Sequence, residues 1–306
     1  MVYASREVHL SVVKAARLAG IQADRVRLLP TDAQFRLNVT ALADAVVADR
    51  QAGLRPFLVI SSAGTVNTGV IDPLESVGEL AAREDLWHHI DGAYGACFYL
   101  CPELRPALAG LSRADSLTLD PHKGLFLPYG IGALLVADGT ALRAVHGSSA
   151  GYLPSTPDAD EFYDPSQHGP DLSRGFPGLR LWLCLKFFGA ARFRAALLEK
   201  HQLAVEAASR IAALEGMSLV NRPALSLFAF HVTWPNASVG EENAATRELL
   251  DRIRARGRVF LTGCTIDDRF YARICVLSFR TRREHMETCL EHLEEELATV
   301  YRSRRR

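Results

Sequence analysis

The chain has 306 residues, and its 35 Lys and Arg residues balance 35 Asp and Glu residues, so its formal charge at pH 7 is zero. This balance argues against a protein that coats nucleic acid or binds an anionic membrane surface. Hydrophobic residues make up 48% of the chain and charged residues 23%, an ordinary globular composition that allows a large core. No apolar run approaches the roughly 20 residues that span a bilayer.

The six cysteines are irregularly spaced and do not indicate a disulfide framework. The first ten residues, MVYASREVHL, lack the basic stretch followed by an apolar stretch that marks a signal peptide. We therefore expect a reduced protein of the cytoplasm.

Short β-rich runs alternate with longer helical patterns in the first half of the chain. Strands are expected at 2–5, 25–29, 57–62, 86–91, 116–120 and 132–138, and helices at 9–20, 39–53 and 74–85. This alternation predicts βαβ units and a largely parallel sheet flanked by helices, which is an α/β fold. In such sheets the functional side chains gather at the carboxyl ends of the strands.

The second half follows a different pattern. Residues 146–174 are rich in Ser, Pro, Asp and Gly, and a loop of this length is usually functional or disordered. A helical pattern then covers 177–214. Further strands are expected at 225–232, 258–262 and 272–279, and further helices at 242–257 and 283–301. We expect a large domain over residues 1–189 and a small α+β domain over residues 190–306.

Lys123 is one candidate catalytic residue. It follows an expected strand, in the segment DPHKG, and an apolar stretch rich in glycine comes after it. Most lysines are solvated surface groups, and that reading remains the alternative. Burial lowers the pKa of an ammonium group and makes it a usable nucleophile or Schiff-base former.

Asp91 is a second candidate. It stands at the end of an expected strand, and Gly92, Ala93 and Tyr94 follow it. Small residues at this point allow another group to approach the backbone closely. The alternative is that Asp91 caps the next helix.

Four segments, in order along the chain, resemble the group II pyridoxal-phosphate-dependent amino-acid decarboxylases, in particular the aromatic-L-amino-acid decarboxylase branch. HIDGAYG and DPHKG place Asp91 and Lys123 32 positions apart. SSAGTVNTGVIDPLESVGEL resembles the family's Gly-Thr segment followed by Asp-Pro-Leu. YASREVHLSVVKAARLAG resembles the stretch that carries the family's ring-stacking histidine. The resemblance implies a fold type I architecture and pyridoxal 5'-phosphate as the cofactor.

The same resemblance implies roles for individual residues. Lys123 would form the Schiff base with the cofactor, and Asp91 would face the pyridine nitrogen and keep it protonated. His9 would stack on the ring. Thr65 would lie near the 3-hydroxyl side, and His122 would orient the phosphate.

Tyr152 lies in the loop 146–174 and would, by resemblance, protonate the substrate carbon after CO2 leaves. Two departures stand out. Gly124 follows the lysine where the family usually has Trp, and Val66 replaces a frequent second Thr. The family also has a further N-terminal part, about a third of its length, which carries the phosphate cradle. We expect this chain to be a fragment, a mis-started product, one of two chains or a degenerate relative.

The resemblance predicts a homodimeric carboxy-lyase that converts an L-amino acid to an amine and CO2, and its aromatic branch favours an aromatic substrate. Two alternatives stay open: another pyridoxal-phosphate lyase or aminotransferase, and a non-catalytic or partner-dependent remnant. A metal site is not expected, because Cys97 and Cys101 have no second pair at zinc-ligand spacing. Dinucleotide binding is not expected either, since the glycines around 64–69 lack the G-x-G-x-x-G pattern.

Overall fold

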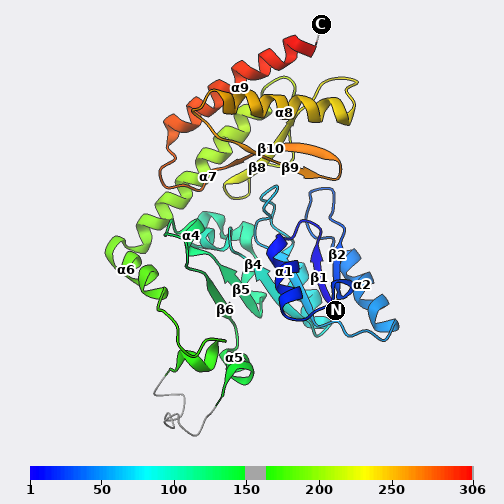
Figure 1. Ribbon diagram of the computed structural model, residues 1–306, viewed down its shortest axis with the longest axis vertical. Coiled ribbons are helices and arrows are strands. Elements are labelled where there is room, and N and C mark those ends of the chain that lie inside the picture. Colours follow the sequence, from blue (N-terminus) through cyan, green and yellow to red (C-terminus); the bar gives the residue numbers. More distant parts are fainter. Residues whose placement is uncertain (149–162, 305–306) are drawn as a thin grey trace.

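The structure is a computed structural model that describes residues 1–148 and 163–304. Within these ranges the first half of the chain forms a sheet in the order β2-β1-β3-β4-β5-β6 (Figure 1). Its strands are β1 Val2–Ser5, β2 Val26–Leu29, β3 Leu58–Ser62, β4 Trp87–Asp91, β5 Ser116–Leu119 and β6 Ala133–Val136. The pairs from β2 to β5 are parallel, and β6 runs antiparallel to β5. The predicted, mainly parallel sheet is therefore confirmed, with an antiparallel strand at one edge.

The strand side chains alternate between the two faces of this sheet. Tyr3 and Val59 belong to a core that also contains residues of α2 (Val39–Gln51) and α3 (Leu74–Arg83). Val2, Ala4 and Ile60 face the opposite side and pack against Val12 of α1 (Leu10–Leu18). Polar residues stand at the carboxyl ends of three strands: Ser62 ends β3, Asp91 ends β4 and Asp120 follows β5.

A second sheet, built from the C-terminal part of the chain, has the order β7-β8-β10-β9 and is antiparallel. Its strands are β7 Met217–Leu219, β8 Leu227–Val232, β9 Thr262–Ile266 and β10 Arg269–Cys275. Helices α7 (Ala190–Ala212), α8 (Val239–Ala255) and α9 (Arg283–Arg304) pack on it around one apolar cluster. Ser238 begins α8 with a capping box that includes Glu241.

Two expectations for this region were wrong. Residues 258–261 are not a strand, and 262–266 pair with 269–273 as a hairpin. The turn residues Asp267 and Asp268 both have positive φ, 43° and 56°, as a two-residue hairpin turn requires. Strand β7 was not expected, because three residues carry too little pattern to indicate a strand.

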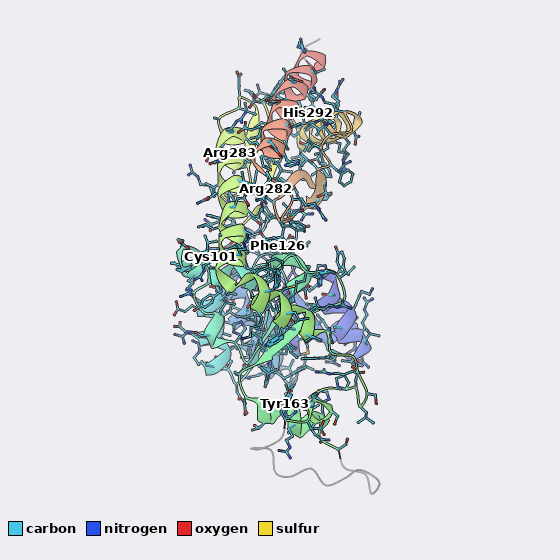
Figure 2. The ribbon with its side chains drawn as sticks, turned by 90° about the vertical axis from the view of Figure 1, so that its left-hand side faces the viewer. Cys101, Phe126, Tyr163, Arg282, Arg283 and His292 are labelled. Carbon is cyan, nitrogen blue, oxygen red and sulfur yellow. The ribbon has the colours of Figure 1, made fainter. Side chains whose placement is uncertain are left out.

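Helix α7 connects the two parts of the molecule and follows α6 (Gly178–Phe188) (Figure 1). Arg282 and Arg283 lie alongside it (Figure 2). The guanidinium group of Arg282 contacts Glu199 at 2.8 Å, and that of Arg283 contacts Glu206 at 2.6 Å. Beside them, Lys200 is fully buried and donates to Glu199 at 2.8 Å and to the Thr281 carbonyl. These contacts fasten α7 to the segment that leads into α9.

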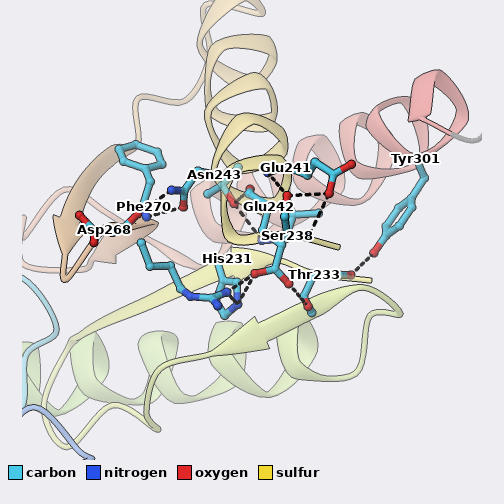
Figure 3. A network of polar contacts seen from close by, with 12 residues as sticks. His231, Thr233, Ser238, Glu241, Glu242, Asn243, Asp268, Phe270 and Tyr301 are labelled. Atoms are coloured by element: carbon cyan, nitrogen blue, oxygen red, sulfur yellow. Dashed lines mark hydrogen bonds and ion pairs between the residues drawn. The ribbon is translucent and has the colours of Figure 1, made fainter. Parts of the chain in front are cut away.

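A polar network joins the start of α8 to the second sheet (Figure 3). The buried carboxylate of Glu242 accepts hydrogen bonds from Arg269 and from the Thr233 hydroxyl. Arg269 also contacts His231 at 2.9 Å. The charges of Glu242 and Arg269 are paired, and the network joins α8 to strands of the second sheet.

The remaining helices are short: α4 covers Pro121–Gly124 and α5 covers Gly139–His146. Of the loop expected at 146–174, the described part contains a 3₁₀ turn at Pro165–His168. No helix in the described part of the chain is long and apolar enough to cross a membrane.

Candidate active site

A cavity of about 680 Å³ lies at the carboxyl ends of β3, β4 and β5, where β8 and β10 of the second sheet close it from the other side. Four of the residues singled out in the sequence line this cavity: His9, Thr65, Asp91 and Lys123. They come from four different segments between the start of α1 and α4. The fold therefore brings together residues that are up to 114 positions apart.

Lys123 lies in the one-turn helix α4, directly after β5. Its side chain is 38% exposed, and its Nζ lies 2.9 Å from Oδ2 of Asp120, which also lines the cavity. The residue after it, Gly124, has no room for a side chain, because a Cβ there would lie 2.5 Å from Cβ of Cys97. This contact is a physical reason for glycine at the position where the family usually has Trp.

Asp91 is the last residue of β4, and in the sheet register it lies between Ser62 of β3 and Thr118 of β5. Its Oδ1 accepts a hydrogen bond from the Ala93 amide at 3.1 Å. Asp91 does not cap the following 3₁₀ helix, which begins at Ala96 with Gly95 as its N-cap residue. The carboxylate is thus held by a local turn at the cavity wall.

Close backbone packing surrounds Asp91, as its small neighbours predict. A Cβ on Gly92 would lie 2.6 Å from Cβ of Ala96 and 2.8 Å from the Thr118 carbonyl oxygen. A Cβ on Gly95 would lie 1.9 Å from the Ala63 carbonyl oxygen. The segment HIDGAYG therefore needs its glycines for packing around the carboxylate.

Thr65 and His9 occupy different environments. Thr65 is buried, and its hydroxyl lies 3.0 Å from that of Thr68. His9 is exposed and is the N-cap of α1, where its Nδ1 accepts a hydrogen bond from the Ser11 amide at 3.2 Å. The cap holds the imidazole at the mouth of the cavity.

One expected site residue is not brought to the cavity, and a second lies outside the described residues. His122 does not line it, since its Nδ1 lies 2.7 Å from the Ile131 carbonyl and its ring packs 5.0 Å from Tyr129. The role of His122 toward a cofactor phosphate stays a prediction. Tyr152 lies outside the described residues.

Several cavity residues were not singled out in the sequence: His89, Thr118, Asp120 and Arg273. His89 and Asp91 share a face of β4, so the period of two could have indicated His89. Asp120 precedes Lys123 by one helical turn. Arg273 had no local signal, because it reaches the cavity from β10 in the other sheet.

Arg273 ties the loop that carries Thr65 to the second sheet. Its guanidinium donates to the Asn67 carbonyl at 3.0 Å and to the Val66 carbonyl. The Asn67 side chain in turn donates to Glu7 at 2.8 Å, and burial raises the pKa of Glu7. The cavity wall is therefore held from both sheets.

The donor set fits the aldehyde and the ring nitrogen of pyridoxal phosphate. A lysine amine can react with the cofactor's aldehyde, and a carboxylate can pair with a protonated ring nitrogen. Both groups line one cavity. Among the residues that the structure describes, no three His, Cys, Asp or Glu side chains gather as metal ligands. The fold and the donor set together define the fold type I class of pyridoxal-phosphate-dependent proteins.

Residues 1–233 match the family model described as the pyridoxal-dependent decarboxylase conserved domain. The chain belongs to the pyridoxal-dependent decarboxylase family. It is 33% identical to the aromatic-L-amino-acid decarboxylase of Bacillus atrophaeus, over 94% of this chain and 60% of the relative. It is 28% identical to the 4-hydroxyphenylacetaldehyde synthase of Rhodiola rosea, over 98% of this chain and 61% of the relative.

The crystal structure of Oryza sativa TDC with PLP and tryptamine is similar to this chain, with a TM-score of 0.92 and 28% identity. The match covers 98% of this chain and 62% of that one. Mouse CSAD is also similar, with a TM-score of 0.84, 26% identity and coverage of 96% and 63%. The chain thus spans about 60% of the length of the curated relatives that it matches.

Proposed function

We propose that the protein takes part in the pyridoxal-phosphate-dependent decarboxylation of an L-amino acid to an amine and CO2. The observation that carries this proposal is that Lys123 and Asp91 line one cavity at the strand ends, together with His9 and Thr65. Within this proposal we favour an aromatic substrate, because similar proteins include aromatic-L-amino-acid decarboxylases from Bacillus atrophaeus and cattle.

When bound, the cofactor supplies the electron sink for the pair of electrons that CO2 leaves behind. Lys123 would hold the cofactor covalently through its amine and release it to the amino group of the substrate. Asp91 would hold a proton on the ring nitrogen, because a nearby opposite charge favours the charged form. Lys123 and Asp91 would thus be the two charged side chains that act directly on the cofactor.

Three further residues would orient the reactants. His9 would cover one face of the ring, and Thr65 would offer a hydroxyl group from the buried loop. Asp120 contacts Lys123 at 2.9 Å and would steer the amine while it is not bound to the cofactor. Tyr152, which lies outside the described residues, remains our proposal for the proton donor to the substrate carbon.

A second product is open to the same site. The similarity to a 4-hydroxyphenylacetaldehyde synthase of Rhodiola rosea and a phenylacetaldehyde synthase of Arabidopsis thaliana favours an aldehyde-forming reaction as the alternative. In that reaction the amino acid would give an aldehyde, CO2 and ammonia, while dioxygen takes up two electrons and becomes hydrogen peroxide. The retained cavity residues are compatible with either outcome, so product analysis must separate them.

The test is incubation of the chain with pyridoxal phosphate and each of the aromatic amino acids, followed by measurement of CO2, amine and aldehyde. Amine and CO2 in equal amounts support the proposal, whereas aldehyde supports the alternative. Asp91→Asn is the matched variant, since it removes the charge and keeps the size of the side chain. We expect it to lower the rate by at least about 10²-fold. Near-normal turnover by this variant would contradict the role of Asp91.

A homodimer in the cytoplasm is part of the proposal. Helix α6 and the segment before it expose large apolar side chains in the single chain: Phe176 at 73%, Trp182 at 54% and Phe187 at 83%. Exposed apolar surface of this kind is typical of an interface. The division of the chain into domains at residue 190 likewise stays a prediction.

A further inference from the structure

A row of hydrogen bonds runs between β4 and β5 to the cavity, which His89 and Thr118 line. Trp87 Nε1 donates to Ser116 Oγ at 2.8 Å, and Ser116 Oγ lies 2.8 Å from His89 Nδ1. On the other side of the imidazole, His89 Nε2 lies 3.1 Å from Thr118 Oγ1. These side chains share the sheet face of Asp91, because His89 pairs with Ser116 and Asp91 pairs with Thr118 in the register.

The chemistry of the groups gives this row a direction. An indole N–H can only donate, so the Ser116 oxygen is the acceptor at that contact. Among the hydrogen bonds of the described residues, His89 Nδ1 is the acceptor that remains for the Ser116 hydroxyl hydrogen. If Nδ1 instead donated to the second lone pair of Ser116 Oγ, the hydroxyl hydrogen of this buried serine would be left without an acceptor. The arrangement that satisfies it has a bare Nδ1 and the ring hydrogen on Nε2.

The direction continues into the cavity. With its hydrogen on Nε2, His89 donates to the Thr118 oxygen. The hydroxyl hydrogen of Thr118 is thereby left to point away from the imidazole, and Thr118 lines the cavity beside Asp91. Burial lowers the pKa of His89, against the opposing effect of the Asp91 charge, which agrees with a neutral ring.

We propose that His89 is a positioning residue that stays neutral and turns the Thr118 hydroxyl into a hydrogen-bond donor beside Asp91. A protonated imidazole at this place would compete with the ring nitrogen of a ligand for the Asp91 charge. The row of hydrogen bonds therefore leaves the Asp91 charge available to the ligand. It also adds the Thr118 hydroxyl to the cavity as one neutral hydrogen-bond donor. The tautomer assignment stands on its own, whereas its use toward a pyridine ring rests on the proposed function.

The assignment is tested by nitrogen NMR of the 306-residue chain labelled with ¹⁵N-histidine, without any cofactor. The variant His89→Gln assigns the His89 signals by their loss. We expect a neutral ring with the hydrogen on Nε2 at pH 7. A hydrogen on Nδ1, or on both nitrogens, would overturn the proposal.

Ser116→Ala removes the hydroxyl that fixes Nδ1, so we expect the His89 signals to shift toward the other tautomer. Ser116→Thr keeps the hydroxyl and should retain the parent signals. The matched control is Ser61→Ala, because Ser61 Oγ lies 2.7 Å from Nε2 of His88 on the opposite face of β4. It should alter His88 and leave His89 unchanged. An unchanged His89 tautomer in Ser116→Ala would also overturn the proposal.

The role of Thr118 is tested by titration with pyridoxal phosphate, followed by absorbance. Thr118→Val removes the donor and should weaken binding about tenfold, as expected for one hydrogen bond, while Thr118→Ser should bind as the parent does. Equal affinity of Thr118→Val and the parent would overturn the assignment of Thr118 as a donor. If the parent chain and every variant failed to bind the cofactor, the proposed function of this chain would fail, and the NMR spectra would still decide the tautomer.

Discussion

Lys123 differs from the other three lysines of the chain in its surroundings. Lys200 is fully buried between Glu199 and the Thr281 carbonyl, and Lys186 lies over the ring of Trp182. Lys14 lies on the exposed part of α1. Only Lys123 among these four combines partial exposure with a place in the cavity.

We therefore expect borohydride reduction of the cofactor-treated chain to leave a pyridoxyl group on Lys123. Peptide mass spectrometry after proteolysis locates the label. Lys123→Ala should lose the label and all turnover while its far-UV circular dichroism stays unchanged, because the role of the amine is chemical. A label on Lys14, Lys186 or Lys200 in the parent chain would contradict the assignment.

His88 makes the stability of the protein sensitive to acid. It is buried, and burial lowers its pKa from 6.5 to about 4, with Asp115 acting in the opposite direction. Between these two values the unfolded chain binds a proton at His88 that the folded chain does not bind. Stability contributed by the neutral ring is thus present above pH 6.5 and is lost as the pH falls toward 4.

The expected consequence is a fall in the free energy of unfolding of up to about 3 kcal/mol between pH 7 and pH 4 from this residue. His88→Gln does not titrate, so its unfolding free energy should fall less over the same range. Urea denaturation of both proteins at several pH values measures the difference. Parallel pH profiles for the two proteins would show that His88 does not titrate as its burial implies.

At the scale of elements, strand β4 shows what sequence patterns can and cannot indicate. The run LWHHID predicted a strand that ends at Asp91, and the structure confirms it at Trp87–Asp91. The sequence did not reveal that His88 and His89 have different roles. That difference depends on which neighbour each face meets: Ser61 of β3 for His88, and Ser116 and Thr118 of β5 for His89.

The loop from Gly64 to Gly69 depends on a contact that no local pattern could reveal. Gly64 has a φ of 106°, and a Cβ there would lie 2.6 Å from the ring of Tyr94. Its neighbours Val66 and Asn67 are held through their carbonyl groups by Arg273, more than 200 positions later in the chain. The contacts of Arg273 with the loop that carries Thr65 therefore form only when both sheets are in place.

Arg273→Met keeps much of the side-chain length but removes both donors. We expect amide hydrogen exchange at residues 66–68 to become about tenfold faster, since a local opening would lose one charge-assisted interaction. Hydrogen-exchange mass spectrometry measures this effect. Arg283→Met is the control, because Arg283 pairs with Glu206 on the surface of α7 and should not affect the loop. Equal exchange in the Arg273 variant and the parent would mean that the loop is held by other contacts.

At the scale of the whole molecule, the two sheets follow the pattern that the sequence predicts: a parallel unit followed by an α+β unit. The sequence indicated only one of the two walls of the cavity between these sheets. Motifs such as DPHKG mark its first wall, whereas Leu227, Arg273 and Cys275 form the second wall from β8 and β10. Contacts between distant segments arise from tertiary packing, which periodicity does not encode.

The charges of the cavity lead to a prediction for the whole chain. Among its described lining residues, Lys123 and Arg273 are cationic, and Asp91 and Asp120 are anionic. Arg273 is engaged with backbone carbonyls, so a phosphate group finds little free positive charge here. We expect the chain to bind pyridoxal phosphate no more than about tenfold more tightly than pyridoxal.

Absorbance titrations with the two compounds, under identical conditions, measure this ratio. Lys123→Ala is the control, because it should weaken the binding of both compounds by removing the amine that they share as a partner. A much stronger preference for the phosphorylated compound would show that the chain holds the phosphate through groups that the cavity residues do not reveal.

The hydrogen bonds between Tyr94 and Ser226 have a consequence for the order of events during synthesis. The Tyr94 hydroxyl accepts from the Ser226 amide at 2.8 Å and lies 3.0 Å from its hydroxyl, which joins residues 132 positions apart. A ribosome releases the strand with Asp91 and the turn with Lys123 well before it has made Ser226 or Arg273. The nascent chain can therefore pair the strands β1 to β6 early, but the cavity lacks its second wall until β8 and β10 emerge.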